Sequence, residues 1–262
     1  MLIQELQQKA KEKKSIGKRD VSFRFYQQCV TEFGSFNAAK ENAGLVIARR
    51  SPCIQLTNKQ KEKTKTLTKI ISYVTFDGHL SKDLKTIYVS SNNIQELLIF
   101  EHWMIKQFNI TAKKIDKTNN KYNNYRIWFF NREVANFLYK VGTPKGDKAL
   151  ISFRIPEWIS KNKEFAREYI KIAYLCEGCN KEYDRPNPRI SFSQNKEEKL
   201  IKEGVVFLDK IKWLLRKFGI NTTTVKIRTG TIRKDGTITK TLRFSILSKD
   251  NSKFYSEIGW LK

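Results

Sequence analysis

The sequence is poor in histidine and cysteine. Its 262 residues include two histidines, His79 and His102, and four cysteines. So few imidazoles exclude most acid–base mechanisms that depend on histidine. A zinc site needs two close pairs of Cys or His, and the chain has one, Cys176 and Cys179, because the other two cysteines are 24 positions apart. The composition therefore favours free thiols over a zinc site.

Long apolar runs are also missing. No run approaches the ~18 residues of a membrane-spanning segment, and the basic residues do not gather on one amphipathic helix. The first 14 residues contain no apolar stretch typical of a signal peptide. We therefore expect a protein that is not secreted, does not bind membranes and works in a reducing compartment such as a prokaryotic cytoplasm.

Positive charge is what the sequence has in excess. Fifty-one Lys and Arg against 26 Asp and Glu give a net charge of +25. The surplus is +8 in residues 1–65, +6 in residues 66–153 and +11 in residues 154–262. A basic tail would concentrate the charge, so this spread indicates a broad binding surface for a polyanion, with nucleic acid as the first candidate.

A polar stretch separates an N-terminal module from the rest. Residues 57–65 contain no apolar side chain and are typical of a linker, which predicts a small helical module over residues 1–65. Within it we predict short helices at 23–30 and 35–43, with Ser35 as N-cap and Gly44 just past the C-terminus. Such a pair is typical of a helix-turn-helix DNA reader or of helices that only pack on the main domain.

Beyond residue 65 the chain repeats itself. An apolar helix ends at Asp77 and Gly78, and another ends 100 positions later at Glu177 and Gly178. A unit of helix, two strands, helix, two strands and helix thus occurs twice. The matching elements are strands 86–91 and 189–194, helices 94–108 and 200–218, strands 125–130 and 241–247, and closing segments 137–142 and 254–259.

Each copy places one carboxylate at the C-terminus of its first helix, Asp77 in one and Glu177 in the other. The helix dipole disfavours a carboxylate there unless a cation neutralises it. Two such groups related by a pseudo-twofold axis suggest a hard divalent cation, Mg²⁺ before Zn²⁺. The alternative is that both are solvated turn residues before a helix-ending glycine, and the spacing is compatible with either.

Several segments resemble a known family. Residues 70–78 (IISYVTFDG) and 170–178 (IKIAYLCEG) resemble the two signature helices of a single-chain LAGLIDADG homing endonuclease. The flanks 142–148, 154–159 and 254–259 resemble those of archaeal-type members, so the resemblance covers roughly residues 66–262. Residues 33–45 resemble the short repeat attached to homing endonucleases, which favours contact between the N-terminal module and DNA.

The resemblance implies a fold. The class would be α+β, with duplicated αββαββα units at residues 66–150 and 151–262. These halves would form a pseudo-twofold saddle of two four-stranded antiparallel sheets, preceded by the small helical module. The signature helices would pack against each other at the pseudo-dyad, and duplex DNA would lie across the sheets.

The resemblance also implies site residues. Asp77 and Glu177 would be the catalytic acids, each serving one DNA strand, and together with Gly78 and Gly178 they would bind Mg²⁺. Gln194 matches a polar position that supports the metal site. In this family the metal ions bind at the scissile phosphates, activate water and stabilise the leaving oxygen.

The third signature position departs from the family, in which a small residue, commonly Gly, lets the helices approach. Ser72 is tolerable in the first helix, whereas the bulky Ile172 would push the backbones apart unless Ala173 or local repacking accommodates it. A shift of ~1 Å at a catalytic centre can cost ~100-fold in rate. Ile172 therefore favours a degenerate relative, whereas the intact acids favour an active enzyme.

Strand periodicity predicts a binding face on each sheet without help from the family. In residues 241–247 apolar side chains alternate with polar ones such as Arg243, and Lys226 and Arg228 alternate with Val225 and Ile227 in the same way. A solvated outer face is the usual alternative for antiparallel sheets, but this composition in a chain of charge +25 favours DNA. The residues expected to contact DNA are Thr86, Tyr88, Ser90, Arg126, Arg189, Ser191, Ser193, Lys226, Arg228, Arg233, Lys234 and Arg243.

Taken together, these features predict a monomeric, Mg²⁺-dependent, site-specific double-strand DNA endonuclease of the mobile-intron type, with a long target site. The alternative on the same scaffold is a protein that binds without cutting. It would be a DNA-binding regulator or an RNA splicing maturase that binds intron RNA.

Overall fold

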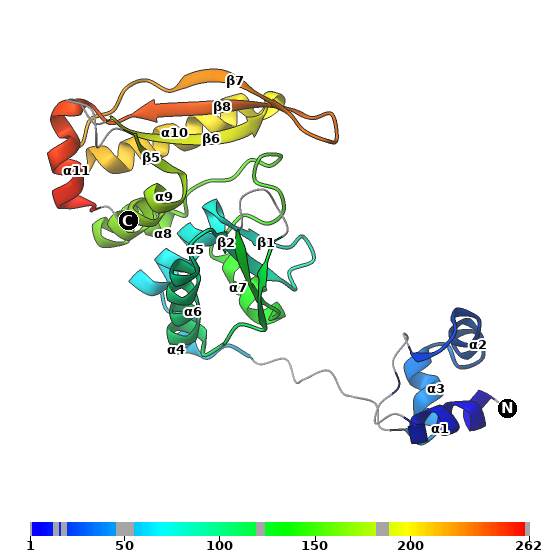
Figure 1. Cartoon of the computed structure of the whole chain (residues 1–262). Helices are drawn as coiled ribbons and strands as arrows, with labels where there is room; N and C mark the ends of the chain where they lie inside the picture. Colours follow the sequence, from blue (N-terminus) through cyan, green and yellow to red (C-terminus); the bar gives the residue numbers. More distant parts are fainter. Residues whose placement is uncertain are drawn as a thin grey trace. The chain divides into compact units, whose positions relative to one another are not determined.

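The computed structural model describes residues 2–12, 16, 20–45, 55–118, 124–181 and 189–259 (Figure 1). The chain divides into two compact units, Met1–Ile54 and Gln55–Lys262. Within the described residues, no helix is long and apolar enough to cross a membrane. Cys29, Cys176 and Cys179 are free thiols, and Cys53 lies outside the described residues.

The N-terminal unit is a group of short helices. They are α1 (Leu2–Glu12), α2 (Phe23–Phe33) and α3 (Phe36–Asn42). Helix α2 ends at Gly34, whose φ of +76° is open to glycine, and Ser35 then caps α3 by accepting a hydrogen bond from the Ala38 amide at 3.0 Å. The predicted helix pair and the predicted cap at Ser35 are confirmed.

Helix α4 (Asn58–Lys61) occupies the stretch that the sequence predicts as a linker. Thr57 and Gln60 form a capping box, and the Gln60 side-chain amide donates to the Phe108 carbonyl oxygen at 2.6 Å. The prediction of a linker over residues 57–65 is wrong, because the polar composition there belongs to a capped, exposed turn of helix that is tied to the larger unit.

The larger unit contains the repeated series of elements. The first half consists of α5 (Lys65–Phe76), β1 (Gly78–Leu80), β2 (Ile87–Ser91), α6 (Ile94–Phe108), β3 (Lys114–Lys117), β4 (Tyr125–Phe129) and α7 (Arg132–Lys140). The second half consists of α8 (Glu157–Lys161), α9 (Lys163–Glu177), β5 (Gly178–Lys181), β6 (Arg189–Glu197), α10 (Ile201–Arg216), β7 (Lys226–Ile232), β8 (Ile238–Ser245) and α11 (Asn251–Glu257). The added element, α8, precedes the second copy.

The strands form two four-stranded antiparallel sheets of the same topology. Sheet A has the order β1-β2-β4-β3 and sheet B the order β5-β6-β8-β7. In Figure 1 the two sheets lie on opposite sides of α5 and α9. The predicted α+β architecture of two duplicated αββαββα units is confirmed.

One hydrophobic core joins the two halves. It contains the inward residues of both sheets and nearly all of α5, in which only Lys65, Thr66 and Lys69 escape full burial. A helix that is apolar on all sides belongs inside a protein. The two halves therefore share their interior, and α5 lies at its centre.

The predicted alternation of β7 is wrong. Ile227 was expected to face the core, yet 55% of its surface is exposed, and Lys226 and Arg228 on either side of it are exposed as well. Strand β7 is the outer strand of sheet B, next to β8 only. All residues of β7 except Gly230 are exposed, so both faces of this edge strand meet solvent and the period of 2 carries no burial information.

Candidate functional site

Helices α5 and α9 run side by side and parallel. Their contacts follow the same order along both helices. Lys65 pairs with Glu164 at 2.7 Å and Lys69 with Glu168 at 3.3 Å, before the helices meet more closely towards their C-termini. Because the helices run in one direction, their C-terminal ends arrive at the same place.

Ser72 forms a buried hydrogen bond between the two helices. Its hydroxyl donates to the Tyr169 carbonyl oxygen at 2.8 Å inside the core. Ile172, on the neighbouring turn of α9, is completely buried. Ser72 thus supplies a close approach to the α9 backbone, and Ile172 packs into the shared core, which is the local repacking that the sequence left open. The effect of Ile172 on the spacing of the helices stays a prediction.

Asp77 and Glu177 meet where the two helices end. The Cys176 thiol donates a hydrogen bond to the Asp77 carboxylate, and both acids are half-buried. Burial raises the pKa of Asp77, and burial followed by the negative charge of Asp77 raises the pKa of Glu177 to about 8. Partial burial and the action of the Asp77 charge on Glu177 argue against the alternative of two separate, solvated turn residues.

Gly78 lets the chain turn directly from α5 into β1. A Cβ at this position would lie 2.7 Å from the Val74 Cα atom and 2.7 Å from a Val89 methyl carbon. No side chain fits there. The glycine after the first acid therefore fixes the direction of Asp77 by close packing.

Lys148 brings a positive charge to the two acids. Its ammonium donates to the Val74 carbonyl oxygen at 3.0 Å and to the Gly78 carbonyl oxygen. Burial lowers the pKa of Lys148 to about 8, against the charges of Asp77 and Glu177, which favour the protonated form. Periodicity gave no signal for this lysine, since it lies in the connecting segment, residues 141–156 between α7 and α8. Only the resemblance of residues 142–148 to the family marked its surroundings.

Lys196 anchors that connecting segment and was also missed. It lies on the inward face of β6, is 1% exposed and donates to the carbonyl oxygens of Lys148 and, at 2.8 Å, Ile151. Its ammonium also lies 4.0 Å from the centre of the Phe153 ring. Lys196 thus holds the backbone that carries Lys148.

Gln194 lies on β6 between two residues that contact parts of the site. On the same face of β6, Phe192 contacts Phe76, which precedes Asp77, and Lys196 binds the Lys148 carbonyl oxygen. Gln194 stands between them in sequence and is 7% exposed. Its Oε1 is buried and has no hydrogen-bond partner among the described residues, so an acceptor oxygen is unused on the face of β6 that contacts Phe76 and Lys148.

These donors fit a magnesium ion better than a softer metal. They are two carboxylates and an unpartnered amide oxygen, all hard oxygen ligands. Within the described ranges, no three His, Cys, Asp or Glu side chains gather closely enough to hold a metal ion by themselves. Mg²⁺ typically takes one or two carboxylates and completes its shell with water and substrate phosphate.

The outward face of sheet B gathers several of the residues predicted to bind DNA. Ser193 pairs across the strands with Arg243, which in turn pairs with Lys226, and Arg228 lies opposite Thr241. Ser191 is an exception, because it is 1% exposed and accepts a hydrogen bond from Arg243 at 2.6 Å. Arg189 is exposed at the start of β6.

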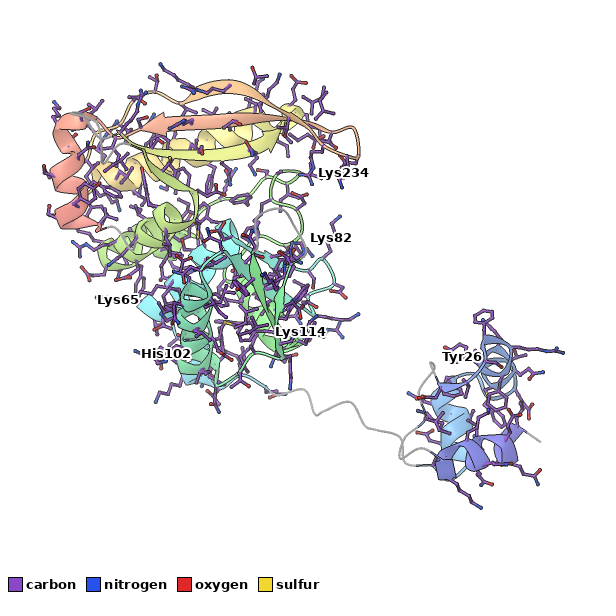
Figure 2. The ribbon with its side chains drawn as sticks, viewed as in Figure 1. Tyr26, Lys65, Lys82, His102, Lys114 and Lys234 are labelled. Atoms are coloured by element: carbon purple, nitrogen blue, oxygen red, sulfur yellow. The ribbon has the colours of Figure 1, made fainter. Side chains whose placement is uncertain are left out.

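The predicted hairpin tip is present between β7 and β8. Gly236 has a φ of +81° and closes the turn. Arg233 forms an ion pair with Asp147 of the connecting segment, whereas Lys234 is exposed at the tip (Figure 2). Arg233 therefore ties the hairpin to the segment that carries Lys148.

The outward face of sheet A holds the remaining predicted residues. Thr86, Tyr88, Ser90 and Arg126 are half-buried there, and Arg126 donates to Ser90 at 3.2 Å. Their partial burial comes from aromatic neighbours on the same face, which periodicity did not bring together.

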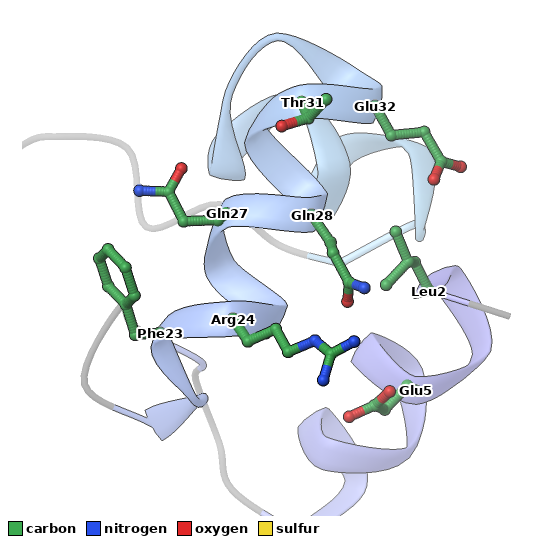
Figure 3. A pocket seen from close by; sticks show the side chains of 8 residues that line it. All are labelled: Leu2, Glu5, Phe23, Arg24, Gln27, Gln28, Thr31 and Glu32. Atoms are coloured by element: carbon green, nitrogen blue, oxygen red, sulfur yellow. The ribbon is translucent and has the colours of Figure 1, made fainter.

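The N-terminal unit has an open groove between α1 and α2 (Figure 3). Its charged side chains are Glu5, Arg24 and Glu32. This mixture of signs gives a polyanion no net attraction. Contact of this unit with DNA therefore stays a prediction from the sequence.

We expect the free energy of unfolding to have a minimum near pH 8. Because the pKa of Glu177 is about 8 when folded and 4.5 ordinarily, the folded state binds more protons between these values, and stability falls as pH rises. Burial lowers the pKa of Lys196 from 10.5 to about 8, so the unfolded state binds more protons above pH 8, and stability rises again.

Urea unfolding from pH 5 to pH 10 measures this profile. Glu177→Gln should flatten the acid limb and Lys196→Met part of the alkaline limb, each by up to about 1.4 kcal/mol per pH unit. Lys148, whose pKa is also lowered to about 8, contributes to the alkaline limb that remains in Lys196→Met. A stability that rises steadily from pH 5 to pH 8 contradicts the shared site.

Comparison with known proteins gives weak sequence matches and matches to one fold. No family model matches the chain. It is 30% identical over 128 residues to a tRNA-splicing ligase RtcB of Pyrococcus abyssi, covering 48% of this chain and 13% of that protein. It is 24% identical over 213 residues to that of Methanopyrus kandleri, covering 76% and 21%. The chain thus spans a small part of the length of the curated relatives it matches.

Among solved structures, the chain is similar to the homing endonuclease I-WcaI bound to its DNA recognition sequence, with a TM-score of 0.47, 11% identity and coverage of 80% and 90% of the two chains. It is also similar to full-length DUF199/WhiA from Thermatoga maritima, with a TM-score of 0.49, 12% identity and coverage of 79% and 58%. Structures of I-DmoI in complex with its target DNA in the presence of Mn or Mg are further matches.

Proposed function

We propose that the chain is a site-specific double-strand DNA endonuclease of the LAGLIDADG homing type, which hydrolyses phosphodiester bonds with divalent metal ions. The observation that carries the proposal is the meeting of Asp77 and Glu177 at the ends of two parallel helices, one acid from each half of the repeat. A duplex is itself close to twofold symmetric, so each acid can serve one strand. Since one chain supplies both acids, a monomer suffices.

The chain's own residues suit this chemistry. Asp77 and Glu177 would hold Mg²⁺, which when bound polarises the phosphate and supplies a hydrolytic water. The Gln194 Oε1, which has no partner among the described residues, would accept a hydrogen bond from a water at the site. The Lys148 ammonium, beside both carboxylates, would stabilise the negative charge that develops on the phosphate during cleavage.

A second candidate function is a DNA-binding regulator or an RNA maturase that does not cut. It is favoured by Lys148, because its ammonium already compensates one negative charge at the site and donates to the Gly78 carbonyl oxygen. While Glu177 is protonated, below its pKa of about 8, such a site needs no metal ion for stability. Cleavage of a duplex in Mg²⁺ decides between the two.

Selection from a random duplex library tests the proposal. The full chain is incubated with the library in Mg²⁺ or in EDTA, and new ends are captured by ligation and sequenced. We expect ends that share one long sequence in Mg²⁺ and are absent in EDTA. Recovery of bound but intact duplexes under both conditions would support the non-cutting candidate instead.

Affinity for duplex DNA should depend steeply on salt. Lys226, Arg228 and Arg243 lie on one face of sheet B, and each phosphate that such a residue neutralises releases a counterion. We expect log K to fall with log salt with a slope of about −5 or steeper, and Arg228→Ala to reduce that slope by about 1 or to relax one base position. An affinity that does not change between about 50 and about 300 mM salt would contradict the proposal that this face binds DNA phosphates.

A further inference from the structure

The outward face of sheet A carries a row of aromatic rings. Strand pairing places His79 beside Tyr88 and Tyr88 beside Trp128, so the rings cross three strands, and Lys114 of β3 follows beside Trp128. The rings of His79 and Tyr88 stack with centroids 5.0 Å apart at 19°, and those of Tyr88 and Trp128 lie 4.7 Å apart. We call these three residues, together with Phe130, the aromatic row.

Phe130 extends the row into solvent. It follows β4 two positions after Trp128, and its ring is nearly parallel to that of Trp128, at 14° with centroids 6.1 Å apart. Half of its surface, 51%, is exposed. The row therefore ends in an accessible ring face on which a further flat ring can stack.

Cations accompany the aromatic row. The Arg126 guanidinium lies 4.4 Å from the Tyr88 ring and 5.3 Å from the Trp128 ring, and the Lys114 ammonium lies 5.0 Å from the Trp128 ring. Lys114, labelled in Figure 2, belongs to the edge strand β3, and it also forms an ion pair with Asp116 at 2.7 Å on the same face. The face thus combines ring surfaces with positive charge, which suits a ligand that has both flat rings and phosphates.

The fold does not require the row, because sheet B lacks it. The corresponding residues of sheet B are Cys179, Ser191 and Ser245, which pair across β5, β6 and β8. Sheet A also keeps the row at a cost, since the Trp128 Nε1 is buried with no hydrogen-bond partner among the described residues. A stabilising cross-strand ladder alone would be equally useful in both halves.

We propose that the outward face of sheet A binds an unpaired nucleobase, which stacks on Phe130 at the end of the aromatic row while Arg126 and Lys114 contact the neighbouring phosphates. In a duplex the bases present their edges to the grooves and not their faces. A ring face therefore selects a base that is single-stranded or taken out of the helix. This inference rests on the proposed function only in that nucleic acid lies on this face.

The test compares two 20-nucleotide ligands for the full chain. One is single-stranded oligothymidine, and the other is an abasic strand with the same number of phosphates, so the difference between them measures the bases alone. At one salt concentration we expect the base-bearing strand to bind about tenfold or more tightly. Phe130→Leu should remove about fivefold or more of this preference and leave the abasic strand unchanged.

Tyr139→Leu is the matched control. Tyr139 is 45% exposed and has the Lys145 ammonium 4.4 Å from its ring centroid, but it lies on α7 and not on the sheet face. Its variant should keep the full preference for bases. Since both aromatic rings are exposed, thermal unfolding of each variant should match that of the wild type.

Equal affinity for the two strands, or an equal loss in Phe130→Leu and Tyr139→Leu, overturns the stacking site. If duplex DNA is still bound in that case, the proposed function stands without it. If no nucleic acid is bound at low salt, both the stacking site and the proposed function are contradicted. A parallel measurement with oligouridine identifies the source of the base, because tighter binding than oligothymidine assigns it to RNA and weaker or equal binding assigns it to DNA.

Discussion

Asp77→Asn and Glu177→Gln should each abolish double-strand cutting, by about a thousandfold or more, and change DNA affinity by less than about tenfold. Each substitution removes one of the two negative charges at the shared site and keeps the shape of the side chain. The charge that holds Mg²⁺ at one strand is then lost, whereas the basic face of sheet B remains intact. A supercoiled plasmid that carries the selected target site separates intact, nicked and linear products.

Exposed acids of the second half provide the controls. Asp209 on α10 pairs with Lys212, and Glu157 on α8 pairs with Lys161, both at the surface. Asp209→Asn and Glu157→Gln change the net charge by the same amount far from the site and should cut like the wild type. Full cleavage by Asp77→Asn or Glu177→Gln would remove these acids from the mechanism.

Ile172→Ala should lower both stability and the rate of cleavage. Ile172 is fully buried in the core that joins the halves, and truncation of such a residue costs about 2–5 kcal/mol because a cavity remains. Helix α9 carries Glu177 at its end, so a loosened helix moves that acid away from Asp77. Urea unfolding and plasmid cleavage on one preparation measure the two effects together.

Ile227→Ala is the control for this substitution. Ile227 lies in the same half at the exposed edge strand β7, where truncation should cost less than about 0.5 kcal/mol. The opposite outcome for Ile172→Ala, a less stable protein that cuts faster, would mean that the isoleucine holds the helices apart. The hydrogen bond from Ser72 to the Tyr169 carbonyl oxygen favours a loss of both stability and cleavage in Ile172→Ala.

The repeat was predictable because patterns within short stretches of sequence define each of its elements. Apolar spacing within helices and alternation within strands identified both copies, and an acid followed by glycine marked the same place in each. Burial then follows wherever a strand has neighbours on both sides, as for Leu242 and Phe244 in β8. For β7 the rule fails at Ile227, because position in the sheet and not sequence decides whether a face is covered.

The cations of the site could not be predicted in the same way. Lys148 reaches the backbone next to Asp77, and Lys196 reaches the backbone of the connecting segment, only because that segment folds back between the halves. No period marks them, and among 51 basic residues neither stands out. Contacts across the sheet, such as that of Arg126 with Tyr88, likewise depend on strand order, which sequence spacing does not give.

Mapping of cleavage on both strands of one duplex shows directly whether Asp77 and Glu177 form one site that serves both strands. The selected target is labelled on each strand with a different dye and incubated with the wild-type chain in Mg²⁺. If Asp77 and Glu177 form one site that serves both strands, each strand is cut once, at two phosphates a few base pairs apart, and neither is cut in EDTA. Tight binding of the same duplex with both strands intact in Mg²⁺ would contradict it.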